Sequence, residues 1–199
     1  MENKYDVVIS GAGPAGSSCA IFLAKKGLNV LLLEKAKFPR DKTCGDAISG
    51  KSMSVVRELG LENEIERNHH AKIFGVTLSS PNGTIVKVPV PKRNNLNRYG
   101  YCTRREVFDN IVFNAVLKEK NVTVIQNFNV TGIIKEDDYV KGIKGKDLTT
   151  GEEKEFFADL VVGADGSHSV VARELGVNVV DNKHYCTAVR AYYEGVTGL

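Results

Sequence analysis

The sequence predicts an α/β fold, because strand-like and helix-like segments alternate along its 199 residues. Residues 5–10 form an apolar run rich in β-branched side chains, residues 15–26 have apolar positions at helical spacing, and residues 29–34 form a second apolar run. A strand, a helix and a strand within about 30 residues make a βαβ unit, whose two strands lie parallel. Gly27 follows the helical stretch and is placed to end the helix.

The rest of the chain adds an inserted antiparallel β element to this start. Residues 35–50 are rich in glycine, proline and charge and are expected to form a loop. Helical spacing predicts helices over residues 51–66, with Gly60 as a stop, and over residues 105–120. The remaining segments are predicted strands: a hairpin at 73–90, a strand at 122–126, a three-stranded meander at 130–134, 140–146 and 154–157, a buried strand at 160–162, and a mid-sheet strand at 188–196.

Composition and charge exclude several classes of protein. The chain has 27 Lys and Arg residues against 24 Asp and Glu residues, and a net charge of +3 is too small to indicate nucleic acid or an anionic membrane as a partner. No apolar stretch approaches the roughly 18–20 residues that span a bilayer, and the first residues do not resemble a signal peptide. The four cysteines are scattered and make no disulfide or zinc pattern. We therefore expect a cytoplasmic protein.

The clearest motif is a G-x-G-x-x-G sequence made by Gly11, Gly13 and Gly16, with Pro14 and Ala15 before the last glycine. It follows a predicted strand and opens a predicted helix, which is the context of a dinucleotide-binding turn. There the first glycine allows the tight turn, the second lets a pyrophosphate approach the backbone, and the third allows close packing of helix on strand. The alternative is a glycine turn that binds nothing.

An acidic residue supports dinucleotide binding. Glu34 lies 23 residues after Gly11, at the end of the second predicted strand. A carboxylate at this place accepts hydrogen bonds from an adenosine ribose and repels a 2′-phosphate. The sequence therefore predicts FAD or NAD in this site, and not NADP.

A second segment, Gly163-Ala164-Asp165-Gly166, ends a predicted strand and leads into a helix. It places a carboxylate at the carboxyl edge of the sheet, where ligands bind in open α/β folds. The alternative is that Asp165 only caps the following helix. Spacing alone leaves these two interpretations equal.

Together with the Arg-Glu-Val-Phe-Asp segment at residues 105–109, these motifs resemble the FAD-dependent oxidoreductases of the para-hydroxybenzoate hydroxylase type. Within that group, residues 38–47 resemble the geranylgeranyl reductase family, whose members carry a Pro-Arg…Cys-Gly segment here. The resemblance covers nearly the whole chain. It implies a Rossmann-like FAD-binding domain over residues 1–199, with a βαβ start and an inserted antiparallel β element.

The resemblance also implies which residues contact the cofactor. Arg40 and the Cys44-Gly45 turn are expected along the flavin side, and Arg105 is expected to approach the cofactor from a helix start. Asp165 and Gly166 would serve both FAD and a nicotinamide dinucleotide arriving from solvent. The other residues implied as contacts are those of the pyrophosphate turn (Gly11, Gly13, Pro14, Ala15 and Gly16), Glu34 and Lys35 near the adenosine ribose, and Val130, whose backbone would meet the adenine.

The chain departs from the family in one respect. The family's third FAD motif, a Gly-Asp segment that holds the ribityl chain, matches nothing after Gly166. Most of the substrate domain would also lie beyond Leu199. We therefore expect an incomplete FAD-binding domain that lacks much of the flavin half of the site, and unpaired sheet edges that lead to self-association.

The function implied by the resemblance is that of an FAD-dependent oxidoreductase using NAD(P)H, NADPH included. It would reduce double bonds of a prenyl or other apolar small molecule, with peripheral membrane contact as a further expectation. The alternatives are a flavin-dependent aromatic monooxygenase, and a truncated dinucleotide-binding fragment without catalysis. No catalytic residue can be assigned, and no metal site is expected. A redox role for Cys44 is disfavoured, because no partner cysteine or histidine is nearby in the sequence.

Overall fold

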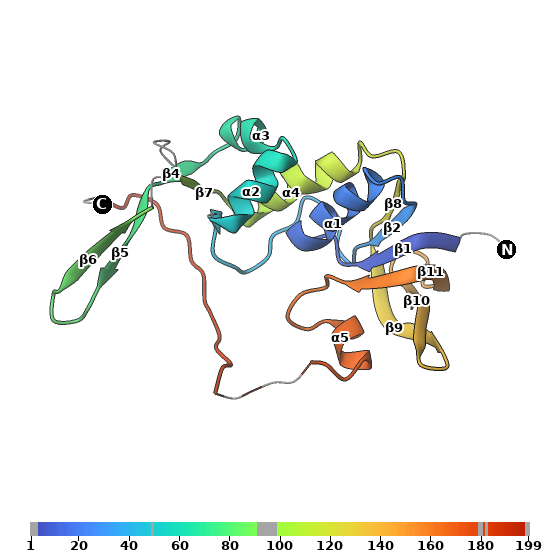
Figure 1. Cartoon of the computed structure of the whole chain (residues 1–199). Helices are drawn as coiled ribbons and strands as arrows, with labels where there is room; N and C mark the ends of the chain where they lie inside the picture. The colour runs from blue at the N-terminus through green and yellow to red at the C-terminus, as the bar shows by residue number, and fades with distance from the viewer. Residues whose placement is uncertain (1–3, 49, 91–98, 179–180, 182, 198–199) are drawn as a thin grey trace. The chain divides into compact units, whose positions relative to one another are not determined.

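The computed structural model describes residues 4–48, 50–90, 99–178, 181 and 183–197 (Figure 1). The chain forms two compact units. We call residues 1–40 with 109–187 the sheet unit, and residues 41–108 with 188–199 the hairpin unit. In the described part of the chain, no helix has the length and apolar character needed to cross a membrane.

The sheet unit is built on one six-stranded sheet in the order β8-β2-β1-β11-β10-β9. Strand β1 is central: Val8 pairs in parallel with Leu31 on β2 and with Val161 on β11. The predicted βαβ start is therefore confirmed. The elements of this unit are β1 (Lys4–Ser10), α1 (Pro14–Ala24), β2 (Val30–Leu33), β8 (Val122–Ile125), β9 (Phe128–Glu136), β10 (Tyr139–Asp147), β11 (Glu153–Gly163) and α5 (Val170–Glu174).

The predicted meander is present, but its third strand is longer than expected. The two strands predicted at 154–157 and 160–162 are one strand, β11, whose first half pairs antiparallel with β10 and whose second half pairs in parallel with β1. The expected burial at 160–162 is also wrong at Leu160, which is 55% exposed.

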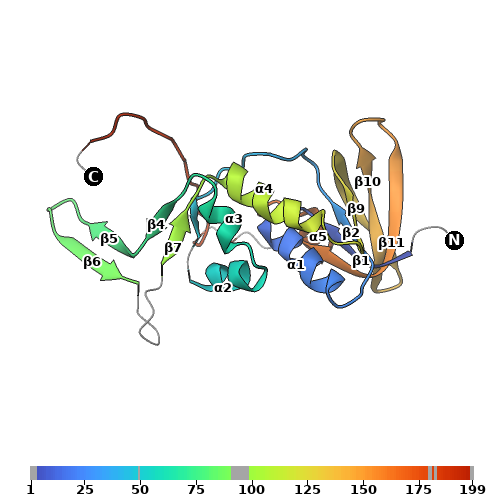
Figure 2. The same ribbon diagram turned by 90° about the horizontal axis from the view of Figure 1, so that it is seen from above.

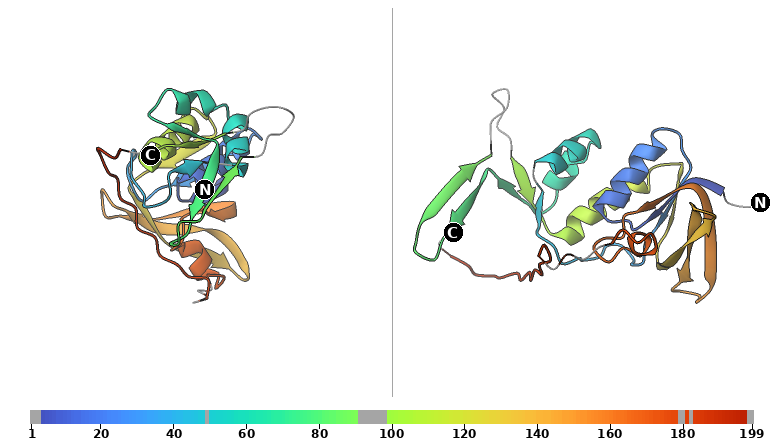
Figure 3. Two further views of the ribbon diagram at one scale, coloured as in Figure 1. Left: turned by 90° about the vertical axis from the view of Figure 1, so that its left-hand side faces the viewer. Right: turned by 60° about the horizontal axis from the view of Figure 1, so that its bottom comes forward.

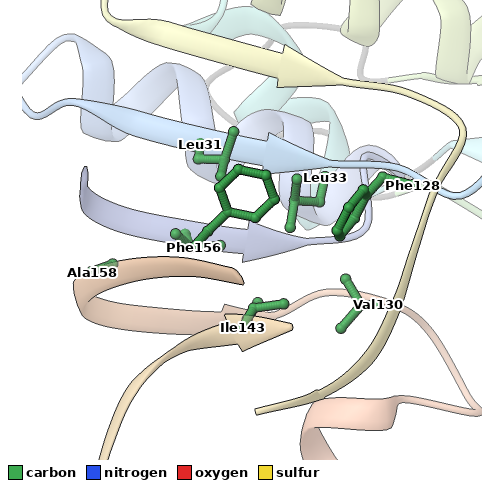
Figure 4. Close-up of a cluster of buried hydrophobic side chains, with 8 residues drawn as sticks. Leu31, Leu33, Phe128, Val130, Ile143, Phe156 and Ala158 are labelled. Carbon is green, nitrogen blue, oxygen red and sulfur yellow. The ribbon is translucent and has the colours of Figure 1, made fainter. Parts of the chain in front are cut away.

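The core of the sheet unit lies between the parallel strands and the meander (Figure 4). Phe128 and Phe156 meet edge to face with ring centroids 5.4 Å apart. Gly145 makes room for them, because a Cβ there would lie 2.5 Å from the Phe128 ring. The buried members of this cluster are Val8, Leu31, Leu33, Phe128, Val130, Ile143, Phe156 and Ala158. Helix α1 packs against the parallel strands through its own buried residues, among them Ala20 and Ile21.

The hairpin unit has a small sheet in the order β3-β7-β4, two short helices and the separate hairpin β5–β6 (Figure 3). The helix predicted over residues 51–66 is interrupted at Gly60, whose φ is +72°. The two-residue strand β3 lies in the segment that was expected to be a loop. The elements are β3 (Ala47–Ile48), α2 (Lys51–Glu58), α3 (Glu62–Glu66), β4 (Ala71–Ile73), β5 (Gly75–Ser79), β6 (Ile85–Pro89) and β7 (Gly100–Cys102), followed by α4 (Arg105–Val116), which begins in this unit and continues into the sheet unit.

The predicted strand at 188–196 is wrong. Residues 188–197 run as an extended segment that belongs to no sheet of the described chain (Figure 2). A strand needs a neighbour with which to exchange backbone hydrogen bonds, and none of the strands in the described residues pairs with this segment. Within this segment Val189 and Tyr193 are strongly exposed, whereas the side chain of Arg190 between them is only 16% exposed.

Candidate functional site

The glycine-rich turn joins β1 to α1, and two of its glycines are required by packing. A Cβ added at Gly11 would lie 2.5 Å from the Ala164 carbonyl oxygen, and one added at Gly16 would lie 1.8 Å from the Gly11 carbonyl oxygen. Gly11 also has a φ of +96°, a conformation that L side chains rarely adopt. At Gly13 the only atom that a Cβ would meet within 4 Å, among the described residues, is Nη2 of Arg40, at 3.5 Å. The turn is therefore in close contact with the protein backbone at Gly11 and Gly16. At Gly13 it has space for a ligand, with the Arg40 guanidinium beside that space.

The start of α1 is suited to an anion. Its N-cap residue, Gly13, has no side chain that could accept from the first backbone N–H groups, and Pro14 is the first helical residue. No acidic side chain occupies the first turn. Unpaired N–H groups and the helix dipole favour a phosphate at such a place.

Glu34 is buried, directly follows β2, and accepts a hydrogen bond at each of its two carboxylate oxygens. Its Oε2 accepts a hydrogen bond from the backbone N–H of Ala12 at 2.8 Å, and its Oε1 accepts from the N–H of Ala36 at 2.9 Å. The acid expected to bind a ribose therefore also fixes the glycine-rich turn. Each carboxylate oxygen has a second lone pair with which it can accept from a ligand hydroxyl.

Arg40 lies between two carboxylates of the sheet unit. Its Nη1 donates to Oδ2 of Asp109 at 3.0 Å, and its Nε lies 3.7 Å from Oε1 of Glu34. The Arg40 guanidinium also lies 4.9 Å from the centroid of the Phe38 ring, which stacks on Phe113 at 4.1 Å. With both acids buried, the guanidinium is held in place while Nη2 remains beside Gly13.

Asp109 is a residue to which the sequence assigned no role. It ends the Arg-Glu-Val-Phe-Asp segment, and its side chain is fully buried against Arg40. The available signal was the buried-face spacing of α4: Asp109 falls among apolar positions, where a carboxylate requires a partner.

The Asp165 segment lies directly beside the glycine-rich turn. The Ala164 N–H donates to the Ser10 carbonyl at 2.8 Å, so two motifs about 150 residues apart meet at one edge of the sheet. Asp165 accepts from the N–H of Val170 at 2.8 Å and from the Ser169 hydroxyl, and Ser169 caps α5 by accepting from the N–H of Ala172. The capping interpretation is therefore partly correct. Ser169 is the N-cap of α5, and Asp165 stabilises the turn before the helix through these hydrogen bonds.

The other predicted contacts are distributed over both units. Lys35 is exposed beside Glu34, and the Val130 side chain belongs to the core, so a ligand can reach Val130 only through its backbone. Cys44, Gly45 and Arg105 belong to the hairpin unit, where the Arg105 N–H donates to Asp46 Oδ1 at 3.3 Å. The structure therefore brings together Gly11, Gly13, Pro14, Ala15, Gly16, Glu34, Arg40, Asp165 and Gly166 within the sheet unit.

No metal chemistry is visible in the described residues, which contain no group of three or more His, Cys, Asp or Glu side chains that could hold an ion. His70 instead bonds the Asn68 carbonyl through Nδ1 at 2.9 Å. Burial raises the pKa of the Cys19 and Cys102 thiols, which lowers their reactivity.

Comparison with known proteins identifies the fold and its relatives. The family of FAD-binding domains matches residues 4–191. A digeranylgeranylglycerophospholipid reductase of Methanosarcina mazei is 36% identical over 180 residues, which cover 89% of this chain and 42% of that protein. Rat squalene monooxygenase is 31% identical over 180 residues, covering 89% of this chain and 30% of that protein. The chain thus spans less than half the length of these curated relatives.

A solved structure agrees with these matches. The geranylgeranyl bacteriochlorophyll reductase-like protein of Thermoplasma acidophilum superposes with a TM-score of 0.73 at 27% identity, over 87% of this chain and 42% of that one. The resemblance inferred from the three motifs and from residues 38–47 is therefore confirmed.

Proposed function

Because this chain belongs to the family of FAD-binding domains, we propose that it is the cofactor-binding part of an FAD-dependent reductase that uses NAD(P)H and acts on a prenyl or other apolar chain. The observation that carries the proposal is the open face of Gly13, flanked by the Arg40 guanidinium and the start of α1. A pyrophosphate carries two negative charges and needs backbone N–H groups at close range. This turn offers both the cation and the N–H groups.

Bound FAD would supply hydride chemistry, by which electrons from NAD(P)H reach a substrate double bond. The residues of this chain bind and orient. Gly13 and Arg40 would hold the pyrophosphate, Glu34 the adenosine ribose, and the backbone of Val130 the adenine. Asp165 and Gly166 would line the edge shared with the nicotinamide dinucleotide. Cys44, Gly45 and Arg105 would contact the flavin side.

The substrate class is proposed from the relatives. One of them is named for reduction of a digeranylgeranyl lipid, and the solved relative for geranylgeranyl reduction. An apolar prenyl chain in a lipid would be met at a membrane surface, so we include peripheral membrane contact and a cytoplasmic location in the proposal.

The cofactor site is tested by adding FAD to the purified chain, removing free FAD and recording the flavin absorption that remains. Arg40→Met should weaken FAD binding by about tenfold or more, since a charge-assisted contact to phosphate is lost. Arg67→Met is the matched control, because Arg67 is exposed and pairs only with exposed Glu64 among the contacts described. A colourless wild-type chain, with no gain in thermal stability from FAD, would support the alternative of a fragment that binds no cofactor.

The second candidate is a monooxygenase, which the 31% identity to squalene monooxygenase favours. The two reactions differ in their need for oxygen. A reductase should oxidise NADPH in the presence of a geranylgeranyl lipid under anaerobic conditions, whereas a monooxygenase should consume oxygen in proportion to substrate. Absence of both kinds of turnover would support the alternative of a dinucleotide-binding fragment without catalysis.

Self-association is also proposed, through the hairpin β5–β6. Its register places Val76 opposite Val88 and Leu78 opposite Val86, so one face is entirely apolar, and all four side chains are more than half exposed. Leu78→Lys should reduce the mean mass in light scattering at high concentration, whereas Thr77→Lys on the other face should not. A monomer at all concentrations would contradict this proposal.

A further inference from the structure

The loop at residues 41–46 of the hairpin unit is held by one distant arginine. Arg190 Nη2 pairs with the carboxylate of Asp41, and Arg190 Nη1 lies 3.4 Å from Oδ1 of Asp46. The same Nη1 donates to the carbonyl oxygen of Lys42 at 3.1 Å. One guanidinium therefore ties together both ends of the loop and its own chain segment.

Tyr192 adds a second contact from the same segment. Its hydroxyl donates to Oδ2 of Asp46 at 2.9 Å. The centroid of its ring lies 4.7 Å from the guanidinium carbon of Arg104 and 4.7 Å from that of Arg190. Asp46 also accepts from the Arg105 N–H, so its carboxylate joins three chain segments. Burial and the hydrogen bond to Asp46 raise the pKa of Tyr192, and the hydrogen bond from Arg190 lowers the pKa of Asp41.

The segment that carries these two residues is otherwise exposed. Val189 is 97% exposed and Tyr193 is 80% exposed, whereas the Arg190 side chain is 16% exposed. In an extended chain alternate side chains point to opposite sides. Arg190 and Tyr192 therefore form the anchoring side, and the anchor is polar rather than apolar.

We propose that Arg190 and Tyr192 are positioning residues that hold the loop at residues 41–46 in one conformation, with Cys44 and Gly45 presented to a ligand between the two anchored aspartates. Cys44 and Gly45 are exposed, whereas the Asp46 side chain that follows them is only 12% exposed. We call the contacts of Arg190 and Tyr192 with Asp41, Lys42 and Asp46 the clasp. The identity of that ligand as the flavin end of FAD rests on the proposed function; the clasp itself does not.

The clasp is tested by digesting the cofactor-free chain with a protease specific for lysine and following cleavage after Lys42 by mass spectrometry. Arg190→Gln should accelerate this cleavage about tenfold, and Tyr192→Phe about threefold, because the first loses ion pairs with two carboxylates and the second loses one hydrogen bond to a carboxylate. Cleavage after Lys87, elsewhere in the same unit, should keep its rate and serves as the measure of overall folding. The alkylation rate of Cys44, relative to Cys102 in the same molecule, gives a second measure of loop conformation.

Matched controls separate the clasp from a general effect of substitution. Arg67→Gln removes an exposed arginine of the same unit, and Tyr193→Phe removes the hydroxyl of the neighbouring exposed tyrosine. Neither should change cleavage after Lys42. Arg190→Lys should give an intermediate rate of Cys44 alkylation, which is the measure used for this variant because the new lysine is itself a cleavage site; an ammonium keeps the charge but cannot span two carboxylates and a carbonyl as a guanidinium does.

Coupling decides whether Arg190 acts through the loop. In a chain that already carries Asp41→Asn and Asp46→Asn, Arg190→Gln should add less than about a twofold change, because the partners are no longer charged. Equal cleavage of Arg190→Gln and Arg67→Gln, or an undiminished tenfold effect in the Asn background, would overturn the proposal. A chain that shows the clasp but binds no FAD would refute the proposed cofactor site and leave the clasp supported.

Discussion

The sheet unit and the hairpin unit use their apolar side chains in different ways. In the sheet unit the meander β9–β11 covers the parallel strands, and Phe128 is only 1% exposed between them. In the hairpin unit Phe74 is 58% exposed, and the apolar face of β5–β6 is open. The ion pairs differ in the same sense: Arg40 meets a fully buried Asp109, whereas Arg67 meets an exposed Glu64.

This difference indicates which interactions stabilise each unit. The sheet unit is held by burial, and its polar groups are fixed by packing around them. The hairpin unit also has buried residues, such as Met53 and Ile65, but its hairpin β5–β6 leaves an apolar face exposed and its loop at residues 41–46 is held by the polar clasp. The glycine-rich turn of the first unit is therefore fixed by packing, whereas the loop at residues 41–46 of the second is fixed by the clasp.

The largest expected difference is between two Phe→Ala substitutions. Phe128→Ala should lower the free energy of unfolding by about 4 kcal/mol, because it opens a cavity in the core. Phe74→Ala should lower it by no more than about 1 kcal/mol, because most of its surface is already in water. Urea unfolding followed by circular dichroism measures both. Equal losses would show that the two units do not differ in the way described.

The next contrast is between two glycines of the same turn. Gly16→Ala should destabilise the chain by about 3 kcal/mol, because its Cβ would overlap the rigid backbone of Gly11. Gly13→Ala should leave unfolding nearly unchanged but weaken FAD binding, because its Cβ would occupy the open face beside Arg40. Denaturation and FAD titration on the same samples distinguish the two effects. A loss of stability in Gly13→Ala as large as in Gly16→Ala would contradict the assignment of an open ligand face.

A third pair compares a buried with an exposed ion pair. Asp109→Asn should lower the free energy of unfolding by about 2 kcal/mol and weaken FAD binding, since Arg40 keeps a hydrogen-bond acceptor but loses a charged partner out of water. Glu64→Gln should change stability by less than about 0.5 kcal/mol. The two variants are compared by thermal unfolding with and without FAD. If Asp109→Asn behaved like Glu64→Gln, the Asp109 contact would not be what holds Arg40.

The smallest expected effect is a shift in titration. The Arg190 hydrogen bond holds the pKa of Asp41 below its ordinary value of 3.8. A lowered folded-state pKa means that the contact stabilises the fold above that ordinary value, and that this contribution is lost as the pH falls through the lowered one. Arg190→Gln should raise the Asp41 pKa toward 3.8, measured by the carboxyl ¹³C shift against pH. An Asp41 titration that is the same in both proteins would mean that the pair does not form in solution.

The sequence predicted those parts of the fold that depend on local patterns. The βαβ start, the interruption at Gly60 and the hairpin around Gly83 follow from short-range periodicity and turn chemistry, and each is present. The strand at 188–196 could not be judged in this way, because a sequence pattern describes one chain segment whereas a strand also requires a neighbour. The division of β11 into two predicted strands has the same origin, since its halves pair with different partners.

For the site, the sequence identified most of the residues but not the contacts that they make with one another. Gly11, Gly13, Gly16 and Glu34 were recognisable from spacing, and the structure places them together. The partnership of Arg40 with Asp109 was not, because it joins residues 69 positions apart through a three-dimensional contact. Asp165 remained ambiguous for a physical reason: the same carboxylate can brace a turn and face a ligand.

The pairing of β1 has a consequence for how the chain is made. One edge of β1 is completed early, by β2, but its other edge is completed only by β11, where Val8 meets Val161. At typical synthesis rates of about 5–20 residues per second, the ribosome needs roughly 8–30 s to deliver β11 after β1 has been made. For that interval β1, whose residues 7–10 are buried in the folded chain, has an open edge that can pair with another strand. The sheet is thus completed early on one side of β1, and on the other side only when β11 has been made.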